Sequence, residues 1–256
     1  MPNGQSTSPE ISPDGWSVPP ETVELFPDEV HVWRCALDVS DGEIARMERT
    51  LASDEREKAA YFRFFWDRNR FIAGRGTLRA ILAQYSNRKP EQLRFLYGPY
   101  GKPRLAGEPD REGIRFNLAH SRGLALYAFA RGREVGIDVE FVRPELGGEE
   151  IARRFFSPVE LAGLAGHSET ARPEAFFRCW TSKEAYLKAR GEGLSFPLDQ
   201  FTVSTSLEGE DRLLAAPEPA EMLSWSLRRL TPAEGYVGTL AVEGGGWRAK
   251  FWKGAD

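Results

Sequence analysis

The sequence predicts an α+β fold built from two similar halves, each with a mostly antiparallel sheet packed on helices. Its 256 residues suffice for one large domain or two small ones, and 41% apolar with 28% charged residues is an ordinary globular composition. Helix-like and strand-like segments follow one another in a similar order in both halves. A weak internal repeat adds to this, since Phe65-Trp66 leads to Gly76 as Cys179-Trp180 leads to Gly191. These observations favour two halves over a barrel or a parallel doubly wound sheet.

Composition also indicates where the halves begin. Residues 1–27 are rich in Pro, Ser and Gly, which predicts a flexible tail. They lack the basic start and apolar stretch of a secretory signal. The first half is then predicted to span residues 28–132 and the second half residues 133–256.

The first half is predicted to contain one long helical region between strands. Ser53 can cap a helix, and Asp54 and Glu55 suit its positive end. The region at residues 58–85 continues as helix, with a break expected around Gly74–Gly76. A turn is expected at residues 98–103. The predicted strands are residues 30–37, 93–97, 114–118 and 124–131.

The second half is predicted to follow the same plan. Residues 151–156 form a short helix, and Ser157-Pro158 begins another. A long helix spans residues 172–190 and ends at Gly191. The predicted strands are residues 134–140, 196–203, 225–230, 236–242 and 247–251.

Charge and composition exclude several functional classes. The formal net charge is −4 and no long run of Lys or Arg occurs, so nucleic acid is not expected as a partner. No segment reaches the ~18 apolar residues of a membrane span. The two cysteines, Cys35 and Cys179, form neither a disulfide framework nor a zinc motif. We therefore expect a cytoplasmic protein that touches neither nucleic acid nor membrane.

Acidic residues form the first candidate site. Asp138 and Glu140 are two apart on a predicted strand, so their carboxylates point to one face. Like charges held together call for a cation, and Mg²⁺ prefers such oxygen ligands. Glu184 and Lys188 share one face of the long helix, which would suit a metal and a phosphate. The alternatives are solvated acids at a strand end and a surface ion pair.

Basic residues form the second candidate site. His120 follows a strand and precedes the Ser121-Arg122-Gly123 turn, a possible phosphate site, although a structural histidine is the alternative. Gly101-Lys102-Pro103 is a tight turn that presents a lysine. The helical region also carries cations that would suit a ligand with several phosphates or would simply form a solvated face: Lys58, Arg63, Arg70 and Arg75.

Several motifs together resemble the Sfp-type 4′-phosphopantetheinyl transferases. The pairing of Gly136-Ile137-Asp138-Val139-Glu140 with Trp180-Thr181-Ser182-Lys183-Glu184-Ala185 is the most specific. The resemblance covers residues 53–203. The other matching motifs are Gly101-Lys102-Pro103, Phe116-Asn117-Leu118-Ala119-His120-Ser121, Phe155-Phe156-Ser157, Lys188 and Gly191-Glu192-Gly193-Leu194.

The resemblance implies a fold and an activity. It implies two pseudo-twofold-related halves in one monomer, with coenzyme A bound in the cleft between them. It implies Mg²⁺-dependent transfer of 4′-phosphopantetheine from coenzyme A to a serine of an apo acyl or peptidyl carrier protein, with release of adenosine 3′,5′-bisphosphate. The carrier interaction would be transient, and Arg153, Arg154 and Arg178 could help to steer it.

The resemblance also implies roles for individual residues. Asp138, Glu140 and Glu184 are similar to the Mg²⁺ ligands, and Lys188 to the residue that contacts the pyrophosphate. The catalytic set is Asp138, Glu184 and Lys188, with Glu184 as the first choice of base and Glu160 as the second. His120 and Lys58 are similar to contacts of the 3′-phosphate. The full implied coenzyme set is Lys58, Arg63, Arg70, Arg75, Gly101, Lys102, Pro103, Ala119, His120, Ser121, Arg122, Lys183 and Lys188.

Two positions depart from the family pattern. Ala119 stands where relatives often have Ser, which removes a hydroxyl contact. Glu55 stands where some relatives have a second basic residue near the 3′-phosphate. Arg63, Arg70 or Arg75 could supply the missing charge, and the sequence does not choose among them.

Two other functions remain alternatives. A Mg²⁺-dependent phosphohydrolase or nucleotidyl transferase could use the same acids and lysine, although no glycine-rich Walker loop is present. A non-catalytic module that binds coenzyme A or a carrier protein is the other. The presence of all three acids favours an enzyme over such a module.

Overall fold

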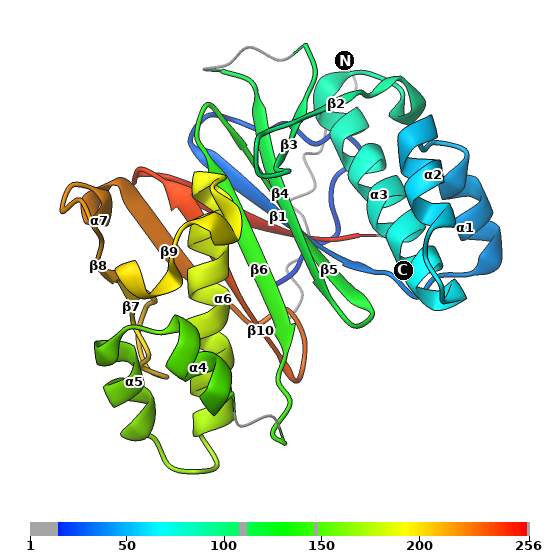
Figure 1. Ribbon diagram of the computed structural model, residues 1–256. Helices are drawn as coiled ribbons and strands as arrows, with labels where there is room; N and C mark the ends of the chain where they lie inside the picture. Colours follow the sequence, from blue (N-terminus) through cyan, green and yellow to red (C-terminus); the bar gives the residue numbers. More distant parts are fainter. Residues whose placement is uncertain (1–14, 108–111, 146–147, 255–256) are drawn as a thin grey trace.

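The computed structural model describes residues 15–107, 112–145 and 148–254. Figure 1 shows helices α1 to α3 on one side of the strands and α4 to α6 on the other. Two sheets lie between these helical layers, and their strand orders are β11-β1-β5-β4 and β6-β10-β9. The arrangement is an α+β fold with several sheets packed on helices, as predicted. The pseudo-twofold relation between the halves stays a prediction.

The first sheet is mostly antiparallel. Strands β1 (Glu29–Ala36), β5 (Leu124–Arg131) and β4 (Ile114–Ser121) pair antiparallel in that order. The last strand of the chain, β11 (Arg248–Lys253), pairs parallel with β1. The predicted second half, residues 133–256, therefore gives its final strand to the sheet of the first half. A local pattern cannot reveal this return, because it depends on pairing across the whole chain.

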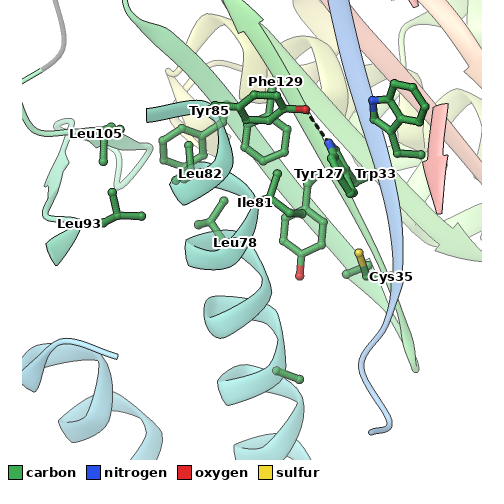
Figure 2. Packing of buried hydrophobic residues seen from close by; sticks show 14 of the residues in the cluster. Trp33, Cys35, Leu78, Ile81, Leu82, Tyr85, Leu93, Leu105, Tyr127 and Phe129 are labelled. Atoms are coloured by element: carbon green, nitrogen blue, oxygen red, sulfur yellow. Dashed lines mark hydrogen bonds between the residues drawn. The ribbon is translucent and has the colours of Figure 1, made fainter. Parts of the chain in front are cut away.

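Helices α1 (Asp41–Glu48), α2 (Ser53–Ala60) and α3 (Phe65–Ser86) cover the outer face of this sheet. Figure 2 shows Tyr85 of α3 turned towards Trp33 and Phe129 of the sheet, and Leu78 and Ile81 belong to the same buried cluster. The indole nitrogen of Trp33 donates to the Tyr85 hydroxyl at 2.8 Å. A short hairpin of β2 (Phe95–Tyr97) and β3 (Pro103–Leu105) follows a 3₁₀ turn, η1 (Pro90–Gln92).

The second half is built around α6 (Arg172–Arg190), which has the predicted bounds. It packs on β6 (Val135–Phe141) and β10 (Tyr236–Glu243), with β9 (Trp225–Leu230) at the sheet edge. Ser157 caps α5 as predicted, since its hydroxyl accepts from the Glu160 amide. The remaining elements are α4 (Glu149–Phe155), α5 (Pro158–Ala165), η2 (Gly193–Ser195), η3 (Leu198–Gln200), β7 (Thr202–Val203), β8 (Leu213–Ala215) and α7 (Glu221–Ser224).

Alternation along the strands divides the interior into three apolar clusters. On β1, Trp33 faces the helices of the first half while Val32 faces the second sheet. On β6, Val135, Ile137 and Val139 face the first sheet. The residues between them, including Asp138 and Glu140, therefore point to the α6 side, because neighbouring strand residues face opposite ways. The prediction that these two carboxylates share a face is thus consistent with the packing.

Three local predictions were wrong. Residues 15–27 are not a flexible tail, because Trp16, Val23 and Leu25 are buried and the Ser17 amide donates to the Phe251 carbonyl. Residues 1–14 of the predicted tail lie outside the described residues. The predicted strand at residues 196–203 is mostly the turn η3, with only β7 extended.

The expected helix break at Gly74–Gly76 was also wrong. α3 runs through both glycines, and the break lies at residues 61–64. A Cβ atom at Gly76 would lie 2.5 Å from Cβ of Met47, so this glycine lets α1 approach α3. The glycine that suggested a helix end instead permits two helices to pack closely. None of the described helices is both long and apolar enough to cross a bilayer.

Candidate active site

Strand β6 and helix α6 form the centre of the candidate site. A Cβ atom at Gly136 would lie 2.0 Å from the Ala185 carbonyl oxygen, and 2.3 Å from the Ala189 amide nitrogen. Only glycine permits α6 to pack this closely on the strand. The close approach brings Glu184 and Lys188, which flank Ala185 and Ala189 on the helix, towards Asp138.

Asp138 is the deepest of the three acids. Its side chain is 7% exposed, and its Oδ1 accepts from Nζ of Lys188 at 2.6 Å. Its other oxygen, Oδ2, is buried without a hydrogen-bond partner. A buried carboxylate oxygen without a donor is costly and calls for a ligand. The Lys188 side chain is 30% exposed, so part of it reaches the surface beside this buried pair.

The three acids influence one another electrostatically. Burial raises the pKa of Asp138, although Lys188 opposes this. Burial and the charge of Asp138 raise the pKa of Glu140, while the Ser121 hydroxyl opposes this. Burial and the charges of Asp138 and Glu140 raise the pKa of Glu184, against the pull of Lys188. The three carboxylates therefore lie close enough to repel one another when ionised, and the nearby positive charge does not fully offset this repulsion.

Ser121 connects the two sheets at this point. Its hydroxyl donates to Oε2 of Glu140 at 2.8 Å and accepts from the Phe141 amide at 3.2 Å. Further along the same seam, Oδ1 of Asn117 accepts from the Ile137 amide at 2.9 Å. Side chains of β4 therefore satisfy part of the free edge of β6. The sequence pointed to Ser121 as a coenzyme contact, whereas here it orients a candidate metal ligand.

The first half brings cations to the same place. Desolvation is the largest cause that lowers the pKa of His120. The positive charges of Lys188 and Arg70 lower it further, whereas the negative charge of Asp138 raises it. His120 therefore lies near the acidic cluster. Arg70 is held by Asp38, with Nε to Oδ1 at 2.7 Å and Nη2 to Oδ2 at 2.9 Å. Asp38 carried no signal in the sequence, because its role depends on the fold.

The Lys102 ammonium is bound within the chain. Its ammonium donates to Oε2 of Glu134 at 2.7 Å, to the Val135 carbonyl at 3.1 Å and to the Ala189 carbonyl at 2.8 Å. All three donors of this ammonium are used, and the predicted contact of this turn with the nucleotide stays a prediction. Lys102 instead ties the β2–β3 hairpin to β6 and to the end of α6. Gly101, at φ +81°, and Pro103 shape the hairpin turn that presents it.

The full burial of Lys183 contradicts its prediction as a coenzyme contact. It is fully buried and donates to Glu160 Oε1 at 2.7 Å. The carbonyls of Leu198 and Phe201 accept its other protons at 2.8 and 2.7 Å. Glu160 is itself fully buried and accepts from the amides of Ser157 and Val203, so it is not a catalytic base. This pair is part of the interior of the second half.

Arg75 makes its contacts within the first half of the chain. Its guanidinium binds Oε1 of Glu55 and the Tyr97 hydroxyl, and Glu55 also pairs with Arg79. Glu55 departs from the family pattern because here it joins two arginines of α3 in the interior. Arg75 therefore does not replace the missing basic contact.

The structure also gives the neighbours of the other predicted site residues. Ala119 is buried beneath the β4 end, and Arg122 lies over the Phe141 ring, 3.6 Å from its centroid. Nζ of Lys58 lies 5.5 Å from the ring centroid of Phe71, and Phe71 is the residue that follows Arg70 in the sequence. Arg63 lies over Phe64 at 5.4 Å. Arg153 and Arg178 pair with Glu149 and Glu174, and Arg154 lies over Phe155.

The donor set suits a hard cation without forming a closed metal site. Among the residues that the structure describes, no three His, Cys, Asp or Glu side chains already stand in metal-binding geometry. The Lys188 ammonium instead occupies one oxygen of Asp138. The free Oδ2 of Asp138 and the raised pKa values of all three acids are what a Mg²⁺ ligand set would show before the cation binds.

Comparison with known proteins decides the family. Residues 134–241, which hold all three acids, match the model of the 4′-phosphopantetheinyl transferase superfamily. The chain is 40% identical to 4′-phosphopantetheinyl transferase HetI of Nostoc sp., over 93% of this chain and 97% of that protein. It is 31% identical to Sfp of Bacillus subtilis, over 67% and 74%. A phosphopantetheinyl transferase of Thraustochytrium sp. is 32% identical over 74% and 68%.

The chain belongs to the 4′-phosphopantetheinyl transferase superfamily. The prediction of a transferase that moves phosphopantetheine from coenzyme A to carrier proteins is therefore confirmed. The cluster of Asp138, Glu140, Glu184 and Lys188 lies within the matched region.

Proposed function

We propose that Asp138, Glu140 and Glu184 hold a Mg²⁺ ion beside the pyrophosphate of coenzyme A, and that this site modifies a serine of an apo carrier protein. The observation that carries the proposal is the buried Oδ2 of Asp138, which lacks a partner, together with two further carboxylates near enough for Asp138 to raise their pKa. Mg²⁺ commonly binds one or two carboxylates together with phosphate oxygens. When bound, the cation would neutralise charge on those oxygens.

Lys188 would stabilise the leaving group. The serine oxygen attacks the phosphorus that carries pantetheine, and the bond from that phosphorus to the bridging oxygen breaks. Adenosine 3′,5′-bisphosphate leaves with the electron pair. Lys188 is partly exposed beside Asp138, so it can donate to the phosphate oxygen on which charge develops.

Glu184 would accept the serine proton through a water molecule. Burial and the charges of Asp138 and Glu140 raise its pKa, which makes it a better proton acceptor than an ordinary carboxylate. Glu160 is excluded from this role by its contacts with Lys183.

The nucleotide would bind on the side of the first half. His120 and Arg70 lie beside the acidic cluster and can face phosphate oxygens. Lys58 remains the proposed contact of the 3′-phosphate, with Arg63 and Arg122 at the border of the site. The backbone at Ala119 replaces the hydroxyl contact of relatives. In this proposal the chain acts as a cytoplasmic monomer and meets its carrier transiently.

Intact-mass spectrometry of an apo carrier protein tests this function. The carrier is incubated with the chain, coenzyme A and Mg²⁺, and it should gain one phosphopantetheine mass. The gain should disappear with a chelator and return with added Mg²⁺. Breakdown of coenzyme A without any change in carrier mass would instead favour the phosphohydrolase alternative. Coenzyme A binding without either reaction would favour a binding module.

A further inference from the structure

The junction between α2 and α3 carries an exposed aromatic patch, defined by Phe64, Phe65 and Trp66. Phe65 is 67% exposed and Trp66 is 51% exposed. The rings of Phe64 and Trp66 are stacked with centroids 4.8 Å apart, and Phe65 meets Trp66 edge to face at 6.3 Å. Tyr61, which is 88% exposed, precedes them. A contiguous exposed apolar surface of this kind commonly marks an interaction site.

The patch leaves α3 without a side-chain N-cap. Phe64 occupies the N-cap position of α3 and makes no side-chain cap hydrogen bond. Ser, Thr, Asp or Asn at this position usually adds about 1 kcal/mol to stability. A large exposed ring where a small polar residue would stabilise the fold points to a use outside the folding of the chain.

The patch borders the candidate active site. Trp66 and Arg70 are four residues apart on α3, so they share a face, about 6 Å apart along the axis. Arg70 lies near enough to His120 to affect its pKa. A macromolecule that rests on the patch therefore has a short path to the acids of β6.

The charge around the patch indicates the charge expected on the surface of its partner. The whole chain is acidic, at −4, whereas residues 56–70 hold five basic and two acidic residues. Arg68 and Arg70 are paired with Glu48 and Asp38. Arg63 lies over the ring of Phe64 in the patch. An acidic protein surface with exposed apolar side chains is complementary to this arrangement.

We propose that the carrier protein docks on the patch of Phe64, Phe65 and Trp66, with Arg63 attracting its acidic surface. This rests on the proposed function and adds where the protein substrate is recognised. The patch exceeds what coenzyme A needs, because an adenine ring covers one or two side chains while three rings and Tyr61 are exposed here. Aromatic side chains of this kind are the usual energetic centres of protein interfaces.

A double variant, F65S/W66S, tests the proposal in steady-state transfer assays with the apo acyl or peptidyl carrier protein that the wild type modifies fastest. KM for the carrier should rise about tenfold, with kcat and KM for coenzyme A unchanged. The matched control is L223S, which removes a side chain that is 90% exposed on α7 and should leave every constant unchanged. Thermal unfolding of both variants verifies folding.

Charge is tested separately. R63Q should raise KM for the carrier about threefold at low salt, and this difference should shrink as salt screens the charge. R212Q, which changes an arginine that is 72% exposed beside β8, is the control.

Three results would overturn the proposal while wild-type transfer persists. They are an unchanged KM for the carrier in F65S/W66S, a rise in KM for coenzyme A instead, and a rise that follows a change in oligomeric state on sedimentation. Failure of the wild type to modify any carrier would count against the proposed function itself, so the two failures are distinguishable.

Discussion

Two adjacent residues of α6 belong to opposite kinds of polar site. Lys183 is fully buried, and Glu160 with two carbonyl oxygens accepts all its protons. Glu184, the next residue, faces Asp138 and Glu140, and the charges of both raise its pKa. In the first region every charge has its partner within the chain. In the second, three acids share the ammonium of Lys188, and Oδ2 of Asp138 has no donor.

This difference distinguishes residues that stabilise the fold from residues that we propose to bind a ligand. A buried charge is tolerable when paired and hydrogen-bonded, and it is then structural. Clusters of like charges without enough opposite charge are typical of functional sites, where a bound ligand supplies the missing charge. By the same criterion the ammonium of Lys102 and the guanidinium of Arg75 are structural, whereas Lys188 belongs to the proposed active site. Four predictions, from the largest effect to the smallest, test this separation.

The substitution Lys183→Met should cost about 3–5 kcal/mol of unfolding free energy, because it leaves Glu160 buried without its cation. Urea denaturation measures it. The double variant K183M/E160Q removes the orphaned charge and should recover part of the loss. A single variant as stable as the wild type would show that the pair does not hold the interior.

The substitution Asp138→Asn should lower kcat for transfer about 100- to 1000-fold, because it removes a charge from the ligand set. Its effect on unfolding should be smaller than that of Lys183→Met, since Lys188 is partly exposed and can be hydrated. Parallel rate and denaturation measurements compare the two. Equal loss of stability in both variants would erase the distinction between the regions.

Acid should destabilise the chain through His31, a buried group with satisfied contacts. Its Nδ1 contacts the Tyr85 hydroxyl at 2.8 Å, and Nε2 contacts Glu29 at 3.1 Å. Burial lowers its pKa from 6.5 to about 4, although Glu29 opposes this. The unfolded chain therefore takes up the proton first, and stability falls as pH drops from 6.5 towards 4.

This shift corresponds to about 3 kcal/mol at its limit. Unfolding free energies at several pH values, for the wild type and for H31Q, measure it. The variant should lose clearly less stability than the wild type across this window. Parallel curves would mean that His31 titrates alike in the folded and unfolded states.

The substitution Ser121→Ala should lower transfer about tenfold, because the hydroxyl that orients Glu140 is lost. As a positioning effect, it should appear as a higher Mg²⁺ concentration for half-maximal rate, with most of kcat recovered at saturating Mg²⁺. S206A, on an exposed loop, is the matched control. An unchanged Mg²⁺ dependence would leave Ser121 as part of the sheet seam alone.

Local signals predicted the parts of the site that a single element determines. Asp138 and Glu140 share a strand face, and Gly191 marks the end of α6. The errors arose where tertiary contacts decide. Lys183 is a cation in a family motif, and only the fold shows that carbonyl oxygens surround it. Gly76 was interpreted as a helix end because its contact with Met47 lies in another helix.

Isothermal titration of Mg²⁺ into the chain with bound coenzyme A tests the central claim most directly. The wild type should bind one ion, D138N should lose measurable binding, and K183M/E160Q should keep it if folded. This result would assign the metal to the acids of β6 and α6. Undiminished Mg²⁺ affinity in D138N would contradict the account, since Asp138 carries its buried, unpartnered oxygen.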